Sequence, residues 1–486
     1  MVNLRPVLFV IGLVLSKLAL FMYVPTLVAF FTGTGGDFLD FAQAVVITHL
    51  AAFICLTIGR TAKFKLSVRD MFLITSLVWT IASAFAALPF VFINHISFTD
   101  AYFETMSGIT TTGSTVLSGL DNMAPSILLW RSILQWLGGG IGFIVMAVAV
   151  LPMLNVGGMR LFQTESSDWS DKSSPRAKTV AKNIVAVYLM LTGLCIVGYL
   201  VTGMNLFEAI NHAFTTLSTG GYSTSDGSMN HFSNGAHWVA TTFMFLGGLP
   251  FLLFIAALRK RRIDVLVNDA QVRGFAYLFV FSSLVISAWL VIRDGYTILD
   301  ALRVSMFNIV SVVTTTGFGL EDFTAWGGAL PTTLFAFLMM AGACSGGSTS
   351  GGIKIFRFQI AMTLLNKQMM KLIHPSGVFV QRYNQRPVND DIVRSVVAFG
   401  LMFFITIIFI AGCLSALGLD PPITSISGAI TAVANVGPGM GSVIGPTGNF
   451  APLPDTAKWL LSFGMLMGRL EILTILVLFF PAFWRR

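Results

Sequence analysis

Residues 315–319 read Thr315-Thr316-Gly317-Phe318-Gly319, and three other segments share this pattern of Thr or Asn, any residue, Gly, any residue and a small residue. The other three are Thr111-Thr112-Gly113-Ser114-Thr115, Thr219-Gly220-Gly221-Tyr222-Ser223 and Asn435-Val436-Gly437-Pro438-Gly439. Their central glycines lie 108, 96 and 120 residues apart along the chain. A loop that recurs at such distances inside hydrophobic sequence indicates a fold built by fourfold internal repetition.

The segments have the composition of a cation filter. A dehydrated cation needs a ring of backbone carbonyl oxygens in place of its water shell, as the TVGYG loops of potassium channels provide. Carbonyls can face one axis only where the backbone adopts conformations that Gly reaches at little steric cost. We therefore predict that the first three residues of each segment form the filter: Thr111, Thr112, Gly113, Thr219, Gly220, Gly221, Thr315, Thr316, Gly317, Asn435, Val436 and Gly437.

The composition excludes an ordinary soluble domain. The chain is 55% hydrophobic and only 11% charged, with a mean hydropathy of +0.80, whereas soluble domains have roughly 25% charged residues. Many windows exceed the roughly 20 apolar residues that cross a bilayer. The four cysteines show neither metal-ligand spacing nor a disulfide pattern, so we expect them to be packing residues: Cys55, Cys195, Cys344 and Cys413.

The hydrophobic pattern predicts ten spans. The expected fold is an all-α integral membrane protein with an N-terminal two-span hairpin and four pseudo-repeats of span, pore half-helix, filter and span around one central pore. The expected units are the hairpin (1–65) and pore repeats 1 (66–170), 2 (171–265), 3 (266–385) and 4 (386–486). The predicted half-helices, too short to span the bilayer, are Asp100–Thr110, Phe207–Ser218, Leu299–Thr314 and Ile423–Ala434.

Three half-helices begin beside an acidic residue: Asp100, Glu208 or Asp300. Negative charge near a helix N-terminus is favourable, and the partially negative C-terminus of each half-helix would then stabilise a cation below the filter. Ordinary helix capping explains the same residues without any ion. The sequence leaves both interpretations open.

Basic residues predict the orientation. With the ten spans predicted above, 24 of the 30 Lys and Arg residues fall on one side of the membrane. The positive-inside rule makes that side cytoplasmic. Both termini are then cytoplasmic and the filters face outward. Thirteen of the 22 acidic residues fall on the outer half, where they would concentrate cations at the mouth. The net charge of +8 therefore reflects topology and not nucleic-acid binding.

Two features are expected below the filter. Residues 342–352 contain only small side chains, so an unbroken helix is unlikely to form there. We predict an intramembrane gate loop whose key residues are Gly342, Ser345, Gly346, Gly347, Gly351 and Gly352. Broken helices at membrane depth line cavities, although small residues for close helix packing are the alternative.

The second feature is Arg469 in the middle of the last span. An intramembrane charge costs at least about 2.5–3.5 kcal/mol, so it is a functional candidate. Aligning the second spans places Arg469 opposite Gly138, just below the filter, where it would form a barrier to cations. A salt bridge to another helix is the alternative. Arg131 is expected at the membrane interface, and Asn211 and His212 are expected to hydrogen-bond the filter scaffold.

Four span, half-helix and span units, each with one Thr/Asn-x-Gly filter, resemble the superfamily of Trk, Ktr and HKT potassium transporters. The two extra N-terminal spans and the length of 486 residues are closest to the bacterial TrkH family of membrane subunits. The resemblance covers nearly the whole chain. It implies potassium uptake across the bacterial inner membrane, with the ion held at the filter carbonyls and the loop and Arg469 as the gate.

The resemblance also implies a homodimer, contact with membrane lipid, and a cytoplasmic nucleotide-binding regulatory subunit similar to TrkA. No nucleotide-binding fingerprint occurs on a strand–helix unit of this chain, so nucleotide control would come from that partner. The implied cargo is potassium, with no organic cofactor. Gly113 resembles the potassium-selective members, since members with Ser there tend toward sodium. Because the Tyr-Gly tail is altered in three segments, we expect a shorter filter than in channels.

Alternative functions remain. A sodium-conducting or weakly selective cation pathway would share the same architecture, as would an ion-coupled potassium symporter. Many secondary transporters have inverted repeats, whereas all four units here enter in the same orientation. A membrane enzyme would need converging nucleophiles, bases or metal ligands, and the six histidines show no such grouping in the sequence. We therefore expect no enzymatic activity.

Overall fold

The computed structural model describes residues 3–33, 35–61, 66–142, 175–323, 326, 328–384, 386–419, 421–446 and 448–485. Over these ranges the chain consists of helices and loops with one small antiparallel pairing, in which β1 (Arg382–Tyr383) pairs with β2 (Arg386–Pro387). The predicted all-α class is confirmed. The unit boundaries at 65 and 170, and the end of repeat 1, lie outside the described residues.

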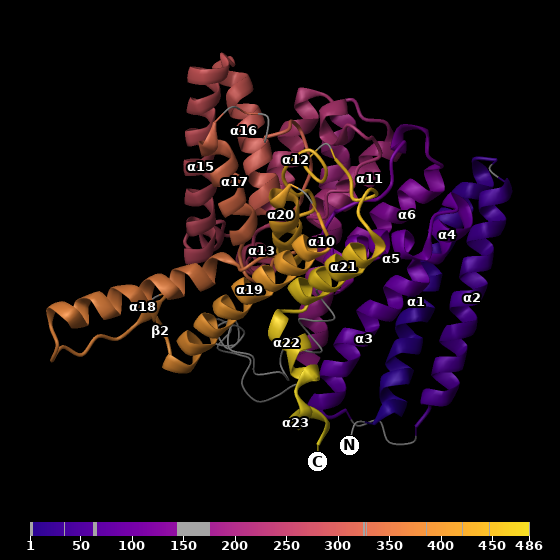
Figure 1. The fold of residues 1–486 in the computed structure, drawn as a ribbon, viewed down its shortest axis with the longest axis horizontal. Coiled ribbons are helices and arrows are strands. Elements are labelled where there is room, and N and C mark those ends of the chain that lie inside the picture. Colours follow the sequence, from indigo (N-terminus) through magenta and orange to yellow (C-terminus); the bar gives the residue numbers. More distant parts are fainter. Residues whose placement is uncertain are drawn as a thin grey trace.

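The N-terminal hairpin consists of α1 (Leu4–Phe31) and α2 (Gly35–Gly59), drawn in indigo in Figure 1. Glycine lets the two helices approach closely, because a Cβ atom at Gly59 would lie 2.4 Å from the backbone nitrogen of Phe9. Small residues at contact points are how membrane helices pack without a hydrophobic driving force between them.

The four repeats follow in chain order. Repeat 1 contains α3 (Val68–Ala86), α4 (Leu88–Asn94), α5 (Phe98–Ile109), η1 (Leu120–Asn122), α6 (Pro125–Trp136) and η2 (Leu137–Gly142). Repeat 2 contains α10 (Pro175–Val201), α11 (Leu206–Leu217), η4 (Ser228–His231), α12 (Asn234–Gly247), α13 (Phe251–Lys260) and α14 (Asp264–Val267). Repeat 3 contains α15 (Ala270–Asp294), α16 (Ile298–Val313), α17 (Ala329–Ala341) and α18 (Ile355–Ile373), followed by the β pairing. Repeat 4 contains α19 (Asp390–Ala416), α20 (Pro422–Ala434), α21 (Asp455–Arg469), α22 (Ile472–Leu476), η5 (Val477–Phe479) and α23 (Pro481–Trp484).

The half-helices are α5, α11, α16 and α20, with 12, 12, 16 and 13 residues. At 1.5 Å per residue they measure roughly 18–24 Å, short of the roughly 30 Å hydrocarbon core. α5 begins two residues before the predicted start at Asp100, because Ser97 caps it by accepting a hydrogen bond from the Asp100 backbone nitrogen. Asn205 and Thr297 cap α11 and α16 through Glu208 and Asp300, so the acidic residues do take part in capping.

Breaks interrupt the second span of three repeats. Six described helices are long and apolar enough to cross a membrane, and two bent pairs raise the number to eight. α12 and α13 meet at 91°, and α21 meets the segment Ile472–Phe479 at 112°. The predicted ten spans would also require α6, whose continuation lies outside the described residues, and α17 with α18, which the loop after Ala341 separates. Figure 1 shows α18 extending away from the body of the molecule.

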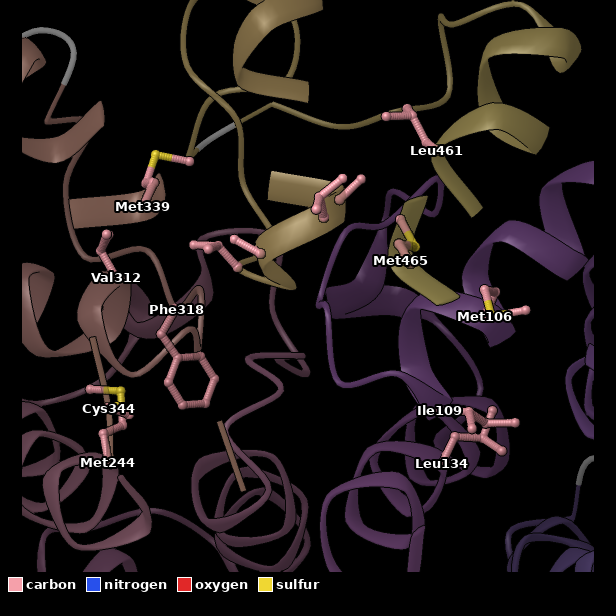
Figure 2. Close-up of a cluster of buried hydrophobic side chains, with 14 of the residues drawn as sticks. Met106, Ile109, Leu134, Met244, Val312, Phe318, Met339, Cys344, Leu461 and Met465 are labelled. Carbon is pink, nitrogen blue, oxygen red and sulfur yellow. The ribbon is translucent and has the colours of Figure 1, made fainter. Parts of the chain in front are cut away.

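Side chains from all four repeats meet in one buried apolar cluster at the centre (Figure 2). It includes Met106 from α5, Val312 from α16, Phe318 from the third filter segment and Leu461 from α21. Many large apolar side chains on the outside of the bundle are exposed, such as Leu401, Phe404 and Ile408 on α19. This distribution suits a molecule whose outer surface contacts lipid.

Candidate cation filter and gate

The four filter segments share one backbone conformation. The first residue has a φ of +54° at Thr111, +53° at Thr219, +55° at Thr315 and +56° at Asn435. The third residue, always Gly, has a φ of +79° to +110°, while the middle residue is not left-handed. The sequence predicts the left-handed glycines but not the left-handed threonines, since a β-branched residue is a genuine outlier there. Such conformations cost about 1–3 kcal/mol each and cluster at functional sites.

The segments close into a ring in chain order. A Cβ atom added at Gly113 would lie 2.2 Å from the carbonyl oxygen of Gly220, and one at Gly221 would lie 1.9 Å from that of Thr316. A Cβ atom at Gly317 would lie 2.2 Å from the carbonyl oxygen of Val436.

The ring is completed between segments 4 and 1, where a Cβ atom at Gly437 would lie 2.7 Å from the carbonyl oxygen of Thr112. Each segment therefore presents the carbonyl of its middle residue to the glycine of the preceding segment. No residue with a side chain fits at the four glycine positions, because real Cβ atoms do not approach an oxygen so closely.

A cavity of about 290 Å³ lies against this ring. All four filter glycines line it, together with Asp226 and Arg131 among other residues. Of the acidic residues expected at the mouth, Asp226 reaches this cavity, whereas Glu104 is fully buried behind the filter. The ring is thus open to a vestibule that carries both charge signs.

Arg131 does not lie on the surface of the helix bundle. Its side chain is buried and forms an ion pair with Glu104 on α5, with Nε 2.9 Å from Oε1. Nη1 donates a hydrogen bond to the carbonyl of Ser223 at 3.0 Å, and the guanidinium carbon lies 4.1 Å from the centre of the Tyr222 ring. Glu104 in turn accepts hydrogen bonds from Thr115 Oγ1 of the first segment and from the backbone nitrogen of Val116, the next residue. The pair therefore connects filter segments 1 and 2 from behind.

Gln135 on α6 also holds segment 2. Its Nε2 donates a 2.7 Å hydrogen bond to the carbonyl of Gly220, and its Oε1 accepts one of 3.0 Å from the backbone nitrogen of Tyr222. The Tyr222 hydroxyl donates to the Glu104 carbonyl at 2.8 Å. His212 on α11 places Nε2 3.0 Å from Ser223 Oγ, as expected for the filter scaffold. Asn211 differs, because its Nδ2 donates to Phe207 within the same helix.

The outer loop of repeat 3 is held by Glu321. Its Oε2 accepts hydrogen bonds from the Tyr296 hydroxyl at 2.9 Å and from Trp326 Nε1 at 3.3 Å. Burial, together with the hydrogen bond to Glu321, raises the pKa of Tyr296 to about 12. The phenol therefore stays protonated and remains a donor across the physiological pH range.

Residues 342–352 form a compact loop after α17. Gly342, Gly347 and Gly352 have a φ of +44°, +77° and +71°. The two ends of the loop touch, since a Cβ atom at Gly342 would lie 2.6 Å from the Cα atom of Gly352. Only glycine permits both the backbone conformation and this approach.

The loop 342–352 contacts segment 3 and the ends of the half-helices that precede segments 2 and 4. Thr349 Oγ1 lies 3.1 Å from the carbonyl of Leu217, and the Gly351 nitrogen donates a 2.7 Å hydrogen bond to Thr315 Oγ1. A Cβ atom at Gly351 would lie 2.5 Å from the carbonyl oxygen of Ala434. The backbone nitrogen of Gly346 donates to Gln271 on α15 at 2.7 Å. The Oγ atoms of Ser345 and Ser350 are buried without a hydrogen-bond partner in the described part of the chain.

Arg469 ends α21 and connects this loop to repeat 1. Nη1 donates a 2.8 Å hydrogen bond to the carbonyl of Thr349, and Nη2 donates one of 3.0 Å to the carbonyl of Gly138. Among the described residues no carboxylate pairs with Arg469, whereas Glu471 pairs with Arg357 at 2.8 Å. The salt-bridge alternative for Arg469 therefore has no partner within the described ranges.

Sequence reasoning missed Arg131, Gln135 and the structural role of Tyr222. The signal for Arg131 was present, since a charge within an apolar helix is a functional candidate by the rule that singled out Arg469. No local signal points to Gln135 or Tyr222, because their partners lie 85 to 118 residues away in the chain.

Comparisons with known proteins agree on one family. The family model TrkH, described as "Cation transport protein", matches residues 40–486. The Trk system potassium uptake protein TrkI of Halomonas elongata is 49% identical over 484 residues, 99% of this chain and 97% of that protein. TrkH of Vibrio parahaemolyticus is 35% identical over 489 residues, 99% of each chain. The crystal structure of the potassium transporter TrkH from Vibrio parahaemolyticus superimposes with a TM-score of 0.91 at 33% identity, covering 99% of this chain and all of that one.

Proposed function

Because this chain belongs to the TrkH family of cation transport proteins, we propose that potassium crosses it through the four-segment ring and past the gate loop. The chain is a multi-pass inner-membrane transporter and not an enzyme. Relatives are named potassium uptake proteins, and potassium is accordingly the cargo.

The observation that carries the proposal is the ring itself. Four segments from four repeats present middle-residue carbonyls to one another's glycines in an unbroken cycle. Two of the four first residues have spare side-chain oxygens, since Thr111 Oγ1 and Asn435 Oδ1 are buried without a hydrogen-bond partner among the described residues. Buried acceptors of this kind normally require a partner, and a dehydrated cation satisfies carbonyl and hydroxyl oxygens alike. The filter residues are those named from the sequence.

The gate part of the proposal rests on the loop and Arg469. The loop touches three of the segments, and the guanidinium of Arg469 in repeat 4 ties it to Gly138 in repeat 1. A fixed positive charge there opposes a cation that leaves the filter. Movement of the loop away from Thr315 and Leu217 would open a path for the cation out of the filter. Gly342, Ser345, Gly346, Gly347, Gly351 and Gly352 give the loop the backbone freedom for that movement.

The assembly and topology complete the proposal. The Trk system includes regulatory subunits such as TrkA, and a nucleotide-binding partner of that kind would act on the basic cytoplasmic segments between Lys354 and Arg394. We further propose a homodimer in the lipid bilayer, with both termini cytoplasmic. The division into a hairpin (1–65) and repeats at 66–170, 171–265, 266–385 and 386–486 belongs to the same proposal.

Ion flux into liposomes that carry the purified protein tests the filter. Potassium, rubidium, sodium and lithium are compared for the wild type, Gly113→Ser and the control Gly400→Ala, whose added Cβ atom meets open space. The proposal expects potassium or rubidium flux well above sodium flux, with that preference reduced only in Gly113→Ser. Equal flux of all four ions in every protein would mean a weakly selective pathway. A proton gradient that drives potassium accumulation would instead identify a symporter.

A further inference from the structure

In repeats 1, 2 and 4, one glycine of the second helix faces the back of the filter. Gly138, Gly247 and Gly468 occupy equivalent places, because a Cβ atom on each would meet the carbonyl oxygen two residues before the first filter residue, at 1.8, 3.3 and 2.0 Å. Three residues earlier in those helices stand Gln135, Met244 and Met465, and in repeat 3 Met339 stands three residues before Gly342, the C-cap residue of α17. All four side chains are buried, and Figure 2 shows the three methionines in the central cluster.

Repeat 1 is thus the exception, with an amide where the other repeats have a thioether. The filter contains a second exception, at the middle residue of segment 2. The middle residue is Thr112, Thr316 or Val436 in three segments, but Gly220 in segment 2 has no side chain. A Cβ atom at Gly220 would lie 2.4 Å from Cδ of Gln135. The Gln135 amide therefore occupies the volume that a side chain at position 220 would need.

The amide also supplies polar contacts in that volume. In segments 1 and 3 the middle threonine hydroxyl lies 2.7 Å from the hydroxyl of Thr110 or Thr314 in its own repeat. Segment 2 has no such hydroxyl, and Gln135 instead bonds the Gly220 carbonyl and the Tyr222 nitrogen. Because one contact needs a donor and the other an acceptor, only a neutral carboxamide of this length makes both.

The Gly220 carbonyl is one of the four that form the ring. A carbonyl oxygen has two acceptor sites, so it can accept from Gln135 and still face a cation, but the hydrogen bond fixes its direction. Among the described residues, no side chain donates a hydrogen bond to the other three ring carbonyls, those of Thr112, Thr316 and Val436. Segment 2 is therefore the one ring member whose carbonyl is oriented by another helix.

We propose that Gln135 is the residue that positions filter segment 2 and thereby sets the discrimination between potassium and smaller cations. The inference rests on the proposed filter function, and it assigns to a residue outside the filter segments a share of ion selectivity. Gln135 replaces the missing side chain of Gly220 and holds its carbonyl at the distance that suits a large dehydrated cation.

Gln135→Met tests this by giving repeat 1 the residue found in the other repeats. We expect the ratio of rubidium to sodium flux in liposomes to fall about two- to tenfold, as loss of a hydrogen bond worth 0.5–1.5 kcal/mol implies. Met244→Leu, at the equivalent position in repeat 2, is the matched control and should leave the ratio unchanged. A Gln135→Met protein with the wild-type ratio would overturn the inference.

A compensating pair separates positioning from general loss of packing. Gly220→Ala alone should abolish selective flux, because its Cβ atom collides with Gln135, and adding Gln135→Ala should restore part of the selectivity. If the double variant is no more selective than Gly220→Ala, the inference that the Gln135 side chain fills the space of a side chain at position 220 is wrong. This comparison also decides the matter if Gln135→Met does not fold. A wild-type protein without ion preference would refute the proposed function instead.

Discussion

Arg131 and Glu104 form an ion pair at 2.9 Å with side chains only 1% and 0% exposed, directly behind two of the four filter segments. Each guanidinium nitrogen donates a hydrogen bond, to Glu104, Ser223 and Thr115, and the carboxylate also accepts from Val116. Buried pairs of this kind are costly to break from one side, because the remaining charge stays buried without a counterion.

Glu104→Gln is therefore expected to destabilise the protein by about 3–5 kcal/mol and to lower its thermal unfolding midpoint in detergent. The double variant Glu104→Gln/Arg131→Gln should be less destabilised than the sum of the single variants, because it leaves no unpaired charge. Asp264→Asn is the control. Its partner Arg262 lowers the pKa of Asp264 by hydrogen bonding, but both side chains are exposed at the start of α14, so the midpoint should not move. Equal midpoints for Glu104→Gln and wild type would contradict the prediction.

Alanine at the filter glycines should impair potassium flux in a definite order. The added Cβ atom would lie 1.9 Å from a neighbouring carbonyl oxygen at Gly221, 2.2 Å at Gly113 and Gly317, and 2.7 Å at Gly437. Gly221→Ala should be the most harmful and Gly437→Ala the least, with every variant strained by its left-handed backbone. Gly400→Ala, in an open part of α19, should keep wild-type flux. A reversed order between Gly437→Ala and Gly221→Ala would count against the ring geometry.

Arg469→Gln should raise potassium flux in the absence of any regulatory partner. The substitution removes the positive charge and weakens the hydrogen bonds to the carbonyls of Thr349 and Gly138, so the gate loop loses a tie worth about 1.5–3 kcal/mol per charged hydrogen bond. Arg469→Lys keeps the charge but cannot reach both carbonyls with a planar fork, and we expect an intermediate flux. Lower flux in Arg469→Gln than in wild type would show that the residue supports conduction and does not restrain it.

Asn435→Asp should weaken the contact between filter segments 4 and 1. Asn435 Nδ2 lies 2.9 Å from both Thr112 Oγ1 and the Met465 carbonyl. Aspartate tolerates the left-handed backbone but has no donor when ionised, so we expect a loss of about 1–3 kcal/mol in stability and reduced flux. Asn230→Asp, on the exposed outer turn η4, serves as the control. Wild-type stability in Asn435→Asp would mean that this bridge does not hold the ring together.

The sequence was sufficient for the class of protein and for the location of the four segments that close into the ring. Hydropathy identifies membrane helices because water is absent from the bilayer core, and the glycine at each third filter position is required by local backbone geometry. The half-helices were located within about two residues for the same reason, since capping residues such as Ser97 act on the adjacent turn.

Other features depended on the tertiary structure. The burial of Arg131, the contact of Gln135 with Gly220, and the left-handed conformation of Thr111, Thr219 and Thr315 all arise from residues distant in the chain or from closure of the ring. A charged or β-branched residue carries no local sign of the partner that stabilises it. The sequence by itself therefore determined where a cation could bind, because that depends on local backbone freedom, whereas only the packing of four repeats decided which side chains hold the ring in place.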